Sequence, residues 1–418
     1  SRSTSSAIFS NCTFLGLIGQ NLMEILEAES IEIYDCQFSS CIVGESLIET
    51  VKANNFNVSN CTFSNDNDAI RLGDFVANGM IYNNSFKQCT SQNGVIYIIG
   101  SALECNIFEN NFTECQSNYD GLAIYIYAGN LINIHNCRFI DNYNRDTDYY
   151  TIYSRANNLN FCDSIIEYSD DIHGCGLNIG TISTSSITNI QFRNLHRPSA
   201  IKYVVDSNNQ IEHSMTVTEC LFTNFQMSGN VLSGYQYSCF QFGDNLNVEF
   251  INNTIEYHKL PASNWDNLFI GKIENKISNC IFSHNEVNER IGGGTGIEFS
   301  GTNVQIINCQ YYCNHAFCIM IDGTLEITEC QFKDNFAGLN QAYESNGGSI
   351  IVLPCTNKGK QRNSESIDIN NCTFFDNKAI HHGGAIYFHV IKKVTISNCL
   401  FENNRANDQY SSTKLLNS

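Results

Sequence analysis

Two adjacent carboxylates are the first candidates for chemistry in this sequence. Asp170 and Asp171 stand side by side, and His173 follows two positions later. Two carboxyl groups act as acid and base on a glycosidic bond only when they are spaced across that bond. Adjacent carboxylates are more typical of a solvated turn. The sequence therefore favours a surface loop here over a hydrolytic site.

Thiols and imidazoles form the second group of candidates. Cys309, Cys313, His315 and Cys318 have ligand types that zinc accepts, but the three residues between the first two make a looser spacing than C-x-x-C. The histidine pair at 381–382 stands beside glycines, as in an exposed turn. Motifs of phosphate-binding loops, nucleophile elbows and zinc proteases do not occur. The sequence predicts no catalytic residue, no bound metal and no cofactor.

The elements that must position these residues follow an internal repeat. One aromatic anchor recurs at intervals of roughly 21 to 30 residues over most of the chain, which is the period range of solenoid repeats. Ser164 and Ile255 are assigned to the two gaps in this series. The aromatic anchors are Phe14, Phe38, Phe63, Phe86, Phe112, Phe139, Phe192, Phe222, Phe282, Tyr311, Phe332, Phe374 and Phe401.

Apolar residues alternate before each anchor, and then the alternation breaks. In the segment 31–38, Ile31 and Ile33 alternate with polar residues, Asp35 breaks the pattern, and Cys36 and Phe38 follow. A period of two is typical of a strand with one buried face. The break predicts a sharp bend, after which the cysteine and the aromatic residue point inward from a second strand.

The position of the bend carries one residue type in most repeats. Asparagine tolerates the left-handed backbone of a tight corner, and stacked asparagine side chains can bond to one another in a ladder. We predict that this corner column, the cysteine column and the aromatic column all run along the core. The corner residues are Asn11, Asn60, Asn83, Asn136, Asn189, Asn252, Asn279, Asn308, Asn371 and Asn398, with Asp35, Glu109, Glu219 and Glu329 in four further repeats.

Cysteine occupies the next position in eleven repeats, which makes this a cysteine-rich chain. A small buried side chain that fills a narrow corner is the favoured interpretation, with most of these thiols unpaired. Cys89 and Cys115 lie three residues after successive anchors, and they are the predicted disulfide. The cysteines of the column are Cys12, Cys36, Cys61, Cys137, Cys162, Cys220, Cys280, Cys309, Cys330, Cys372 and Cys399.

A glycine-bearing turn after the anchor leads to another apolar strand, as at 94–99, 121–126 and 383–388. Each repeat thus supplies three short strands. We predict an all-β fold, a single-stranded right-handed parallel β-helix of about fifteen coils, each with three short strands. Residues 1–418 are expected to form one continuous domain, with a loop insertion near 355–366. The core is expected to be lined by pairs such as Cys36 with Phe38, Cys61 with Phe63, Cys137 with Phe139, Cys372 with Phe374 and Cys399 with Phe401.

A paired motif in the last third of the chain resembles a known family. Phe374-Phe-Asp-Asn377 is followed by Gly383-Gly-Ala-Ile386, and the same pairing recurs less closely around Phe332. Phe-x-x-Asn with Gly-Gly-Ala-Ile is the signature of the chlamydial polymorphic outer-membrane protein repeats, and similar repeats occur in protist surface proteins. The resemblance implies a right-handed parallel β-helix at a cell surface, with an adhesive or structural role.

Charge and hydropathy exclude several partners. The net charge is -19 with 23 lysines and arginines, so no basic stripe is available for nucleic acid or for an anionic membrane. No stretch reaches the roughly 20 apolar residues of a membrane helix. An extracellular or cell-surface location is expected, with any membrane anchor outside this chain.

These observations predict a structural or adhesive protein and not an enzyme. It would act as a rod-like scaffold or binding surface for other surface proteins or glycans, and it could also self-associate end to end as the protomer of an extracellular assembly. The alternative is a carbohydrate-active enzyme of the polysaccharide lyase or polygalacturonase-like type, because this architecture also hosts such enzymes. As a glycoprotein, the chain would carry glycans at Asn57 and Asn111, two sequons that lie off the corner column.

Overall fold

A computed structural model gives the structure of the protein, and every regular element among its described residues is a β-strand. No helix in the described part of the chain is long and apolar enough to cross a membrane. The chain divides into two compact units, Ser1–Thr216 and Val217–Ser418. The structure describes residues 5–100, 103–119, 121–143, 149–169, 174–180, 184–195, 200–203, 213–225, 240–242, 246–260, 269–270, 274–287, 297–314, 317–337, 348–357, 360–362, 366–388 and 392–406.

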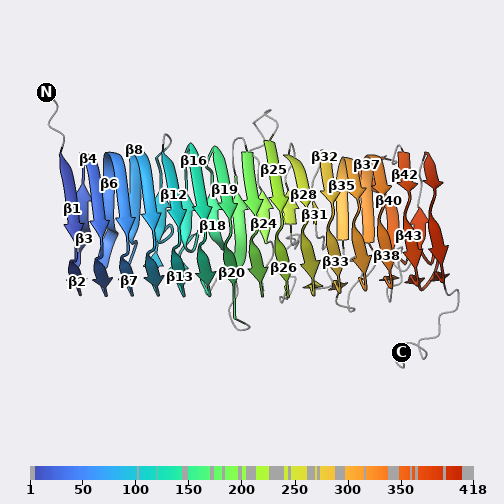
Figure 1. Cartoon of the computed structure of the whole chain (residues 1–418), viewed down its shortest axis with the longest axis horizontal. Coiled ribbons are helices and arrows are strands. Elements are labelled where there is room, and N and C mark those ends of the chain that lie inside the picture. Colours follow the sequence, from blue (N-terminus) through green and yellow to red (C-terminus); the bar gives the residue numbers. More distant parts are fainter. Residues whose placement is uncertain are drawn as a thin grey trace. The chain divides into compact units, whose positions relative to one another are not determined.

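The strands form coils that stack in parallel, as the alternation predicts (Figure 1). One coil of the first unit consists of β9 (Ser85–Lys87), β11 (Ile96–Ile98) and β12 (Glu104–Phe108). The next coil repeats it with β13 (Asn111–Thr113), β15 (Ile124–Ile126) and β16 (Leu131–His135). Equivalent strands pair in parallel and in register, so that Phe86 lies beside Phe112 and Ile96 beside Ile124. This arrangement confirms a parallel β-solenoid.

The strand that carries the anchor is the clearest repeating element. Among the described residues of the first unit it occurs eight times: β2 (Thr13–Leu15), β5 (Gln37–Ser39), β7 (Thr62–Ser64), β9, β13, β17 (Arg138–Ile140), β20 (Ile165–Glu167) and β23 (Gln191–Arg193). In the described part of the second unit it occurs seven times: β26 (Leu221–Thr223), β29 (Thr254–Glu256), β33 (Ile281–Ser283), β36 (Gln310–Tyr312), β38 (Gln331–Lys333), β43 (Thr373–Phe375) and β47 (Leu400–Glu402). Continuity of one domain over 1–418 stays a prediction.

The anchors stack as a column inside each unit. In the first unit the rings of Phe14, Phe38 and Phe63 lie with centroids 4.8 and 4.7 Å apart and nearly parallel. In the second unit Phe374 and Phe401 are stacked at 4.7 Å. Phe38, Phe63, Phe139 and Phe374 are fully buried, whereas Phe401 in the last described coil is 46% exposed.

One anchor assignment is wrong. Ile166, and not Ser164, lies in register between Phe139 and Phe192. Ser164 stands instead in the cysteine column, where its Oγ accepts a hydrogen bond from the backbone N–H of Cys137 at 3.0 Å. Cys162 therefore does not belong to that column. The error arose because this coil has neither an aromatic residue at the anchor position nor a cysteine at the column position, so the repeat was aligned on Cys162 and Ser164 instead.

The remaining cysteines of the column are inward-facing thiols. Cys36, Cys61, Cys137 and Cys372 are buried, and Cys399 is half-buried in the last described coil. None of these five forms a disulfide, as predicted for most of the column, and the thiol of Cys61, for example, donates to a carbonyl oxygen of its own coil, Ser59 O, at 3.2 Å. Burial raises the pKa of Cys61 to about 12 and that of Cys137 to about 12. Cys61 and Cys137 are therefore protonated packing groups.

The predicted corner has the expected backbone but not the expected burial. All fifteen residues of the corner column, including Asp163, have φ between 50° and 57°. Their side chains are exposed, so this column lies on the surface and not in the core as predicted. Lateral bonds occur between some neighbours, such as Asn83 Nδ2 to Asn60 Oδ1 at 2.7 Å and Asn308 Nδ2 to Asn279 Oδ1 at 2.8 Å. The corner residue precedes the inward-facing cysteine, and its own side chain points outward, which explains why that side chain is exposed.

A second corner contains the buried asparagine ladder. The residue three positions after the anchor points inward, and the residue before it has a positive φ, as at Asp334 (φ 54). Asn335 Oδ1 accepts from the backbone N–H of Asn314 at 3.0 Å and from its Nδ2 at 3.2 Å, while Asn335 Nδ2 donates to Tyr311 O at 3.0 Å. In the next coil, Asn377 Oδ1 accepts from the backbone N–H and from the Nδ2 of Asn335, both at 3.1 Å. This ladder explains the asparagine of the Phe-x-x-Asn motif.

The predicted insertion forms a hairpin. β40 (Ile350–Asn357) pairs antiparallel with β41 (Lys360–Arg362), from Cys355 beside Arg362 to Asn357 beside Lys360. It is the only antiparallel pair among the strand pairs whose register the structure describes.

Asp66 occupies the second corner of its coil, where other coils carry asparagine. It is 0% exposed, and its carboxylate accepts from the backbone N–H groups of Cys41 at 2.7 Å and Ser64 at 2.9 Å. Burial raises the pKa of Asp66 above its ordinary value of 3.8, against the effect of these two hydrogen bonds. A buried charge without a cationic partner destabilises the folded state at neutral pH.

We expect Asp66→Asn to raise the free energy of unfolding by about 1 kcal/mol at neutral pH, because asparagine keeps an acceptor and removes the charge. Since the folded pKa lies above the unfolded one, the penalty in the wild type develops as pH rises through both values. The advantage of the variant should therefore vanish below about pH 3.8. Urea denaturation of both proteins at a series of pH values measures it. A variant less stable than the wild type at pH 7 contradicts the argument.

Candidate binding groove

Most residues predicted for chemistry do not meet in a site. Asp170, Asp171, His173 and His315 lie outside the described residues. Cys309 belongs to the core column, where its thiol donates to Ile307 O at 3.3 Å. Within the described ranges no group of three or more histidine, cysteine or acidic side chains could hold a metal ion.

The two glycosylation candidates have different surroundings. Asn111 in β13 is exposed, and its Oδ1 accepts from the Thr113 hydroxyl at 3.4 Å. Asn57 lies in β6 (Ile42–Ser59) and is half-buried, with an Oδ1 that has no hydrogen-bond partner among the described residues. Glycans at both positions stay predictions, and the exposure of Asn111 makes it the more accessible acceptor.

The predicted disulfide between Cys89 and Cys115 is not formed. Both are free, buried thiols at the second corner of neighbouring coils. Each Sγ is directed to the carbonyl oxygen of an earlier anchor, Cys89 to Phe63 and Cys115 to Phe86, both at 3.6 Å. A hydrogen bond with the Cys115 thiol, together with burial, raises the pKa of Cys89. The two thiols stack along the column as packing groups.

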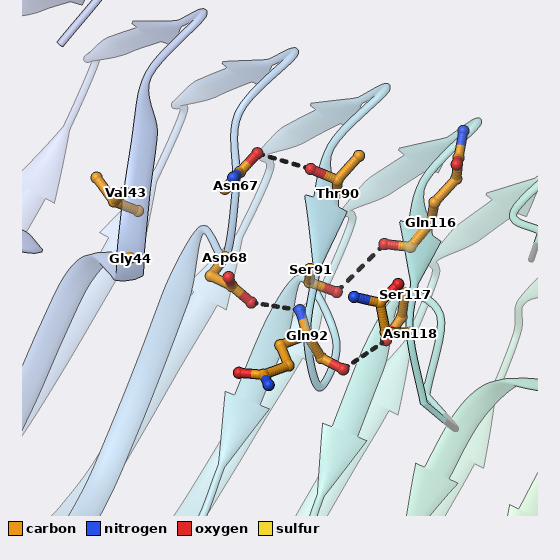
Figure 2. A pocket seen from close by; sticks show the side chains of 10 residues that line it. All are labelled: Val43, Gly44, Asn67, Asp68, Thr90, Ser91, Gln92, Gln116, Ser117 and Asn118. Carbon is orange, nitrogen blue, oxygen red and sulfur yellow. Dashed lines mark hydrogen bonds between the residues drawn. The ribbon is translucent and has the colours of Figure 1, made fainter. Parts of the chain in front are cut away.

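A polar pocket lies on the outside of the first unit, just after the second corner. It has a volume of about 370 Å³ and is lined by residues of four successive coils (Figure 2). Its walls are held by hydrogen bonds from Thr90 Oγ1 to Asn67 Oδ1 at 2.7 Å and from Ser117 Oγ to Gln92 O at 3.2 Å. The lining residues are Val43, Gly44, Asn67, Asp68, Thr90, Ser91, Gln92, Gln116, Ser117 and Asn118. Hydroxyl and amide groups therefore dominate its surface.

A second pocket of about 470 Å³ shares Gly44, Asp68 and Gln92 with the first. We call the two together the polar groove. The second pocket adds charged and aromatic side chains to the amides and hydroxyls of the first. Its other lining residues are Glu45, Ser46, Ile70, Arg71, Asn93, Gly94 and Tyr97.

Asp68 stands where the two pockets meet. Its backbone has φ 43, and its Oδ1 accepts the backbone N–H of Gln92 at 2.8 Å. Burial raises the pKa of Asp68 to about 6, although that hydrogen bond and the charge of Arg71 act in the opposite direction. The carboxyl group can therefore change its charge close to neutral pH.

Arg71 connects the groove to the sheet beside it. Its guanidinium lies 3.2 Å from Glu45 and 3.4 Å from Glu49, and 5.7 Å from the ring centre of Tyr97. β8 (Ile70–Tyr82) carries Arg71 at an outward position, in register with Glu49 on one side and Tyr97 on the other. Two carboxylates and an aromatic ring thus fix the arginine at the edge of the groove.

A row of tyrosines continues from that edge. Tyr97, Tyr125 and Tyr153 are in register on β11, β15 and β18 (Tyr150–Ser154), and all three are half-buried. Their ring centres are 5.4 and 4.6 Å apart, and Arg155 lies 5.6 Å from the centre of the Tyr153 ring. The isoleucines on either side of Tyr97 and Tyr125 point inward, which leaves the tyrosines on the outer face. We call these three residues the tyrosine row.

Sequence reasoning found neither the groove nor the tyrosine row. The segments 94–99 and 121–126 were recognised as equivalent strands, and both have tyrosine at the same place in the pattern. That shared outward aromatic residue was the available signal. The groove gave no such signal, because its polar residues come from turns of varying length.

Comparison with known families agrees with the geometry. A family model described as a right-handed beta helix region matches residues 264–415. Comparison with curated proteins gave no match. The matched region covers coils of the second unit, and the described strands of the first unit stack in the same parallel manner. The chain is therefore an all-β protein with the fold of a right-handed parallel β-solenoid, as the sequence predicts.

Proposed function

We propose that this protein is a non-catalytic β-solenoid scaffold that binds a carbohydrate chain along the polar groove and the tyrosine row. The observation that carries the proposal is the row itself, since Tyr97 lines the groove and Tyr125 and Tyr153 extend it in register. Aromatic faces pack against the C–H faces of sugar rings, and fixed amides and hydroxyls orient sugar hydroxyl groups. An elongated ligand fits this arrangement because the contacts repeat once per coil.

The charges favour neutral or cationic sugars over acidic ones. Glu45, Glu49 and Asp68 stand around a single cation, Arg71, which already contacts two of these carboxylates. The whole chain carries a net charge of -19. Like charges at a binding surface oppose association, so a uronate or sulfated polymer is disfavoured.

An extracellular or cell-surface location belongs to the same proposal. Support comes from the likeness of the Phe-x-x-Asn and Gly-Gly-Ala-Ile repeats to surface proteins and from the exposed sequon at Asn111. In that setting the solenoid displays its outer face to glycans or to other surface proteins. End-to-end assembly of several copies is compatible with this display, because it would leave the groove and the tyrosine row uncovered.

A carbohydrate-active enzyme is the second candidate, and one observation favours it. Asp68 has a pKa raised to about 6 by burial and lines the groove, which are properties of a general acid or base. Catalysis of glycoside hydrolysis also needs a second carboxyl group held across the scissile bond. Glu45, which also lines the groove, and Glu49 are both in contact with Arg71. Binding without turnover therefore fits the arrangement better.

We expect the double variant Tyr97→Ala/Tyr125→Ala to weaken binding of a neutral oligosaccharide about 30-fold, at about 1 kcal/mol per ring. Isothermal titration of the full chain with neutral and acidic oligosaccharides of equal length measures it. Tyr312→Ala, a half-buried outward tyrosine of the second unit, is the matched control and should leave affinity unchanged.

Recovery of the oligosaccharides after incubation distinguishes the two candidates. Intact sugar supports a binding scaffold, and cleavage that Asp68→Asn abolishes supports the enzyme. If neither neutral nor acidic sugars bind the wild type, the proposed function is wrong. Equal losses in the double variant and in Tyr312→Ala would also count against it.

A further inference from the structure

The carboxylate of Asp68 has an oxygen that the structure leaves available. Oδ1 accepts from Gln92 N at 2.8 Å, and within the described residues Oδ2 takes part in no hydrogen bond or ion pair. An ionised carboxylate can accept about four hydrogen bonds. Asp68 lies in the wall of both pockets of the polar groove, so a ligand in either can reach it.

Other polar atoms of the same pocket also have no protein partner. Ser46 is 1% exposed and lines the pocket, and its Oγ has no hydrogen-bond partner in the described part of the chain. The same holds for the Nε of Arg71, which is also buried. Buried polar groups are normally satisfied, and exceptions point to a water, an ion or a ligand that completes them. Both residues line the pocket that Asp68 borders.

The charged side chains around Asp68 indicate the charge of the ligand group that would bind to it. Arg71 is the only cation that lines the second pocket, and its guanidinium contacts Glu45 and Glu49. From the next coil Gln92 and Asn93 add no charge. Among the described residues Asp68 therefore forms no direct ion pair, and a cationic ligand group would neutralise its negative charge.

We infer that Asp68 binds the ammonium group of an amino sugar, so that the groove prefers a chain with free amino groups over its N-acetylated form. This inference rests on the proposed carbohydrate binding. Tyr97 beside Asp68 favours a sugar ring over a lysine side chain, because a ring offers a flat C–H face to the tyrosine while its amine reaches the carboxylate. The raised pKa of Asp68 agrees with this, because an ammonium group would restore the ionised form that burial disfavours.

The test compares two ligands on the full chain. β-Linked glucosamine oligomers and their N-acetylated counterparts of equal length are titrated at about pH 7, where such an amine is largely protonated. We expect the amino form to bind about tenfold more tightly. Asp68→Asn should reduce that preference to less than about twofold, chiefly by weakening binding of the amino form. Asparagine tolerates the positive φ at this position, so the variant should fold.

Asp163→Asn is the matched control, since Asp163 is an exposed acid at the surface corner of the same unit. It should keep the tenfold preference. Equal binding of both oligomers would overturn this inference and leave carbohydrate binding intact. Binding of neither oligomer would overturn the proposed function itself. Tighter binding of an oligolysine peptide than of the amino sugar would show that the groove serves a basic peptide instead.

Discussion

Replacement of Asn335 by alanine should lower the free energy of unfolding by about 3–5 kcal/mol. Asn335 is 2% exposed, and its amide takes part in four hydrogen bonds of the ladder. Without it, the backbone N–H of Asn314 and the carbonyl of Tyr311 stay buried without partners. Each buried polar group that is left without a hydrogen-bond partner costs about 1–3 kcal/mol. Chemical denaturation of the full chain measures the loss.

Asn308→Gly is the matched control for this variant. Asn308 lies in the neighbouring coil at the exposed corner, with φ 50, and among the described residues its side chain makes one hydrogen bond, to Asn279 at 2.8 Å. Glycine adopts a positive φ without strain, so the change should cost less than about 1 kcal/mol. Similar losses for the two variants would mean that the buried ladder contributes no more than a surface contact.

Phe139→Ala should be destabilising by a similar amount, about 3–5 kcal/mol. The ring is 0% exposed, lies 5.0 Å from Phe112 in a stacked arrangement, and meets the edge of Phe161 at 6.2 Å. Ile166 follows it in the next coil, so the lost ring leaves a cavity between two filled layers. Thermal and urea unfolding give the change in stability.

Phe401→Ala provides the comparison within the same column. Its ring is 46% exposed and has a stacked partner on one side only among the described residues, so its removal leaves a smaller void. A loss of about 1 kcal/mol is expected there. If Phe139→Ala cost no more than that, Phe139 would not be part of a close-packed core.

The inward face of the coils could be predicted from the sequence because every coil imposes the same constraint on it. Aromatic residues such as Phe38 and cysteines such as Cys36 recur along the sequence because each coil leaves the same space for them to fill. Asp35 marked the first corner correctly, and its φ of 53 confirms the reason given for it. The alignment of the repeats was wrong at Ser164, because Ile166 replaces the aromatic anchor of this coil and no motif remained to guide the alignment.

The burial of the polar columns could not be predicted from residue type. Asn308 at the first corner is exposed, and Asn335 at the second is buried, although both follow a repeating pattern. Which of them points inward depends on how many residues each turn contains, and periodicity alone does not fix that number. The groove around Asp68 was missed for a related reason. Most of its polar side chains are exposed or half-buried, and the stacking of coils places no restriction on residue type there.

The buried asparagine ladder also gives the protein a direction of growth. Asn377 Oδ1 accepts from Asn335 in the preceding coil, and Asn377 Nδ2 donates to the anchor carbonyl of that same coil, Phe332 O, at 3.0 Å. Asn404 repeats both contacts towards Asn377 and Phe374. Each coil is thus completed by the one that follows it in the chain. During synthesis from the N-terminus, every coil that leaves the ribosome would close the polar groups of the last one made and offer the next unfilled template, so that folding can keep pace with translation one coil at a time.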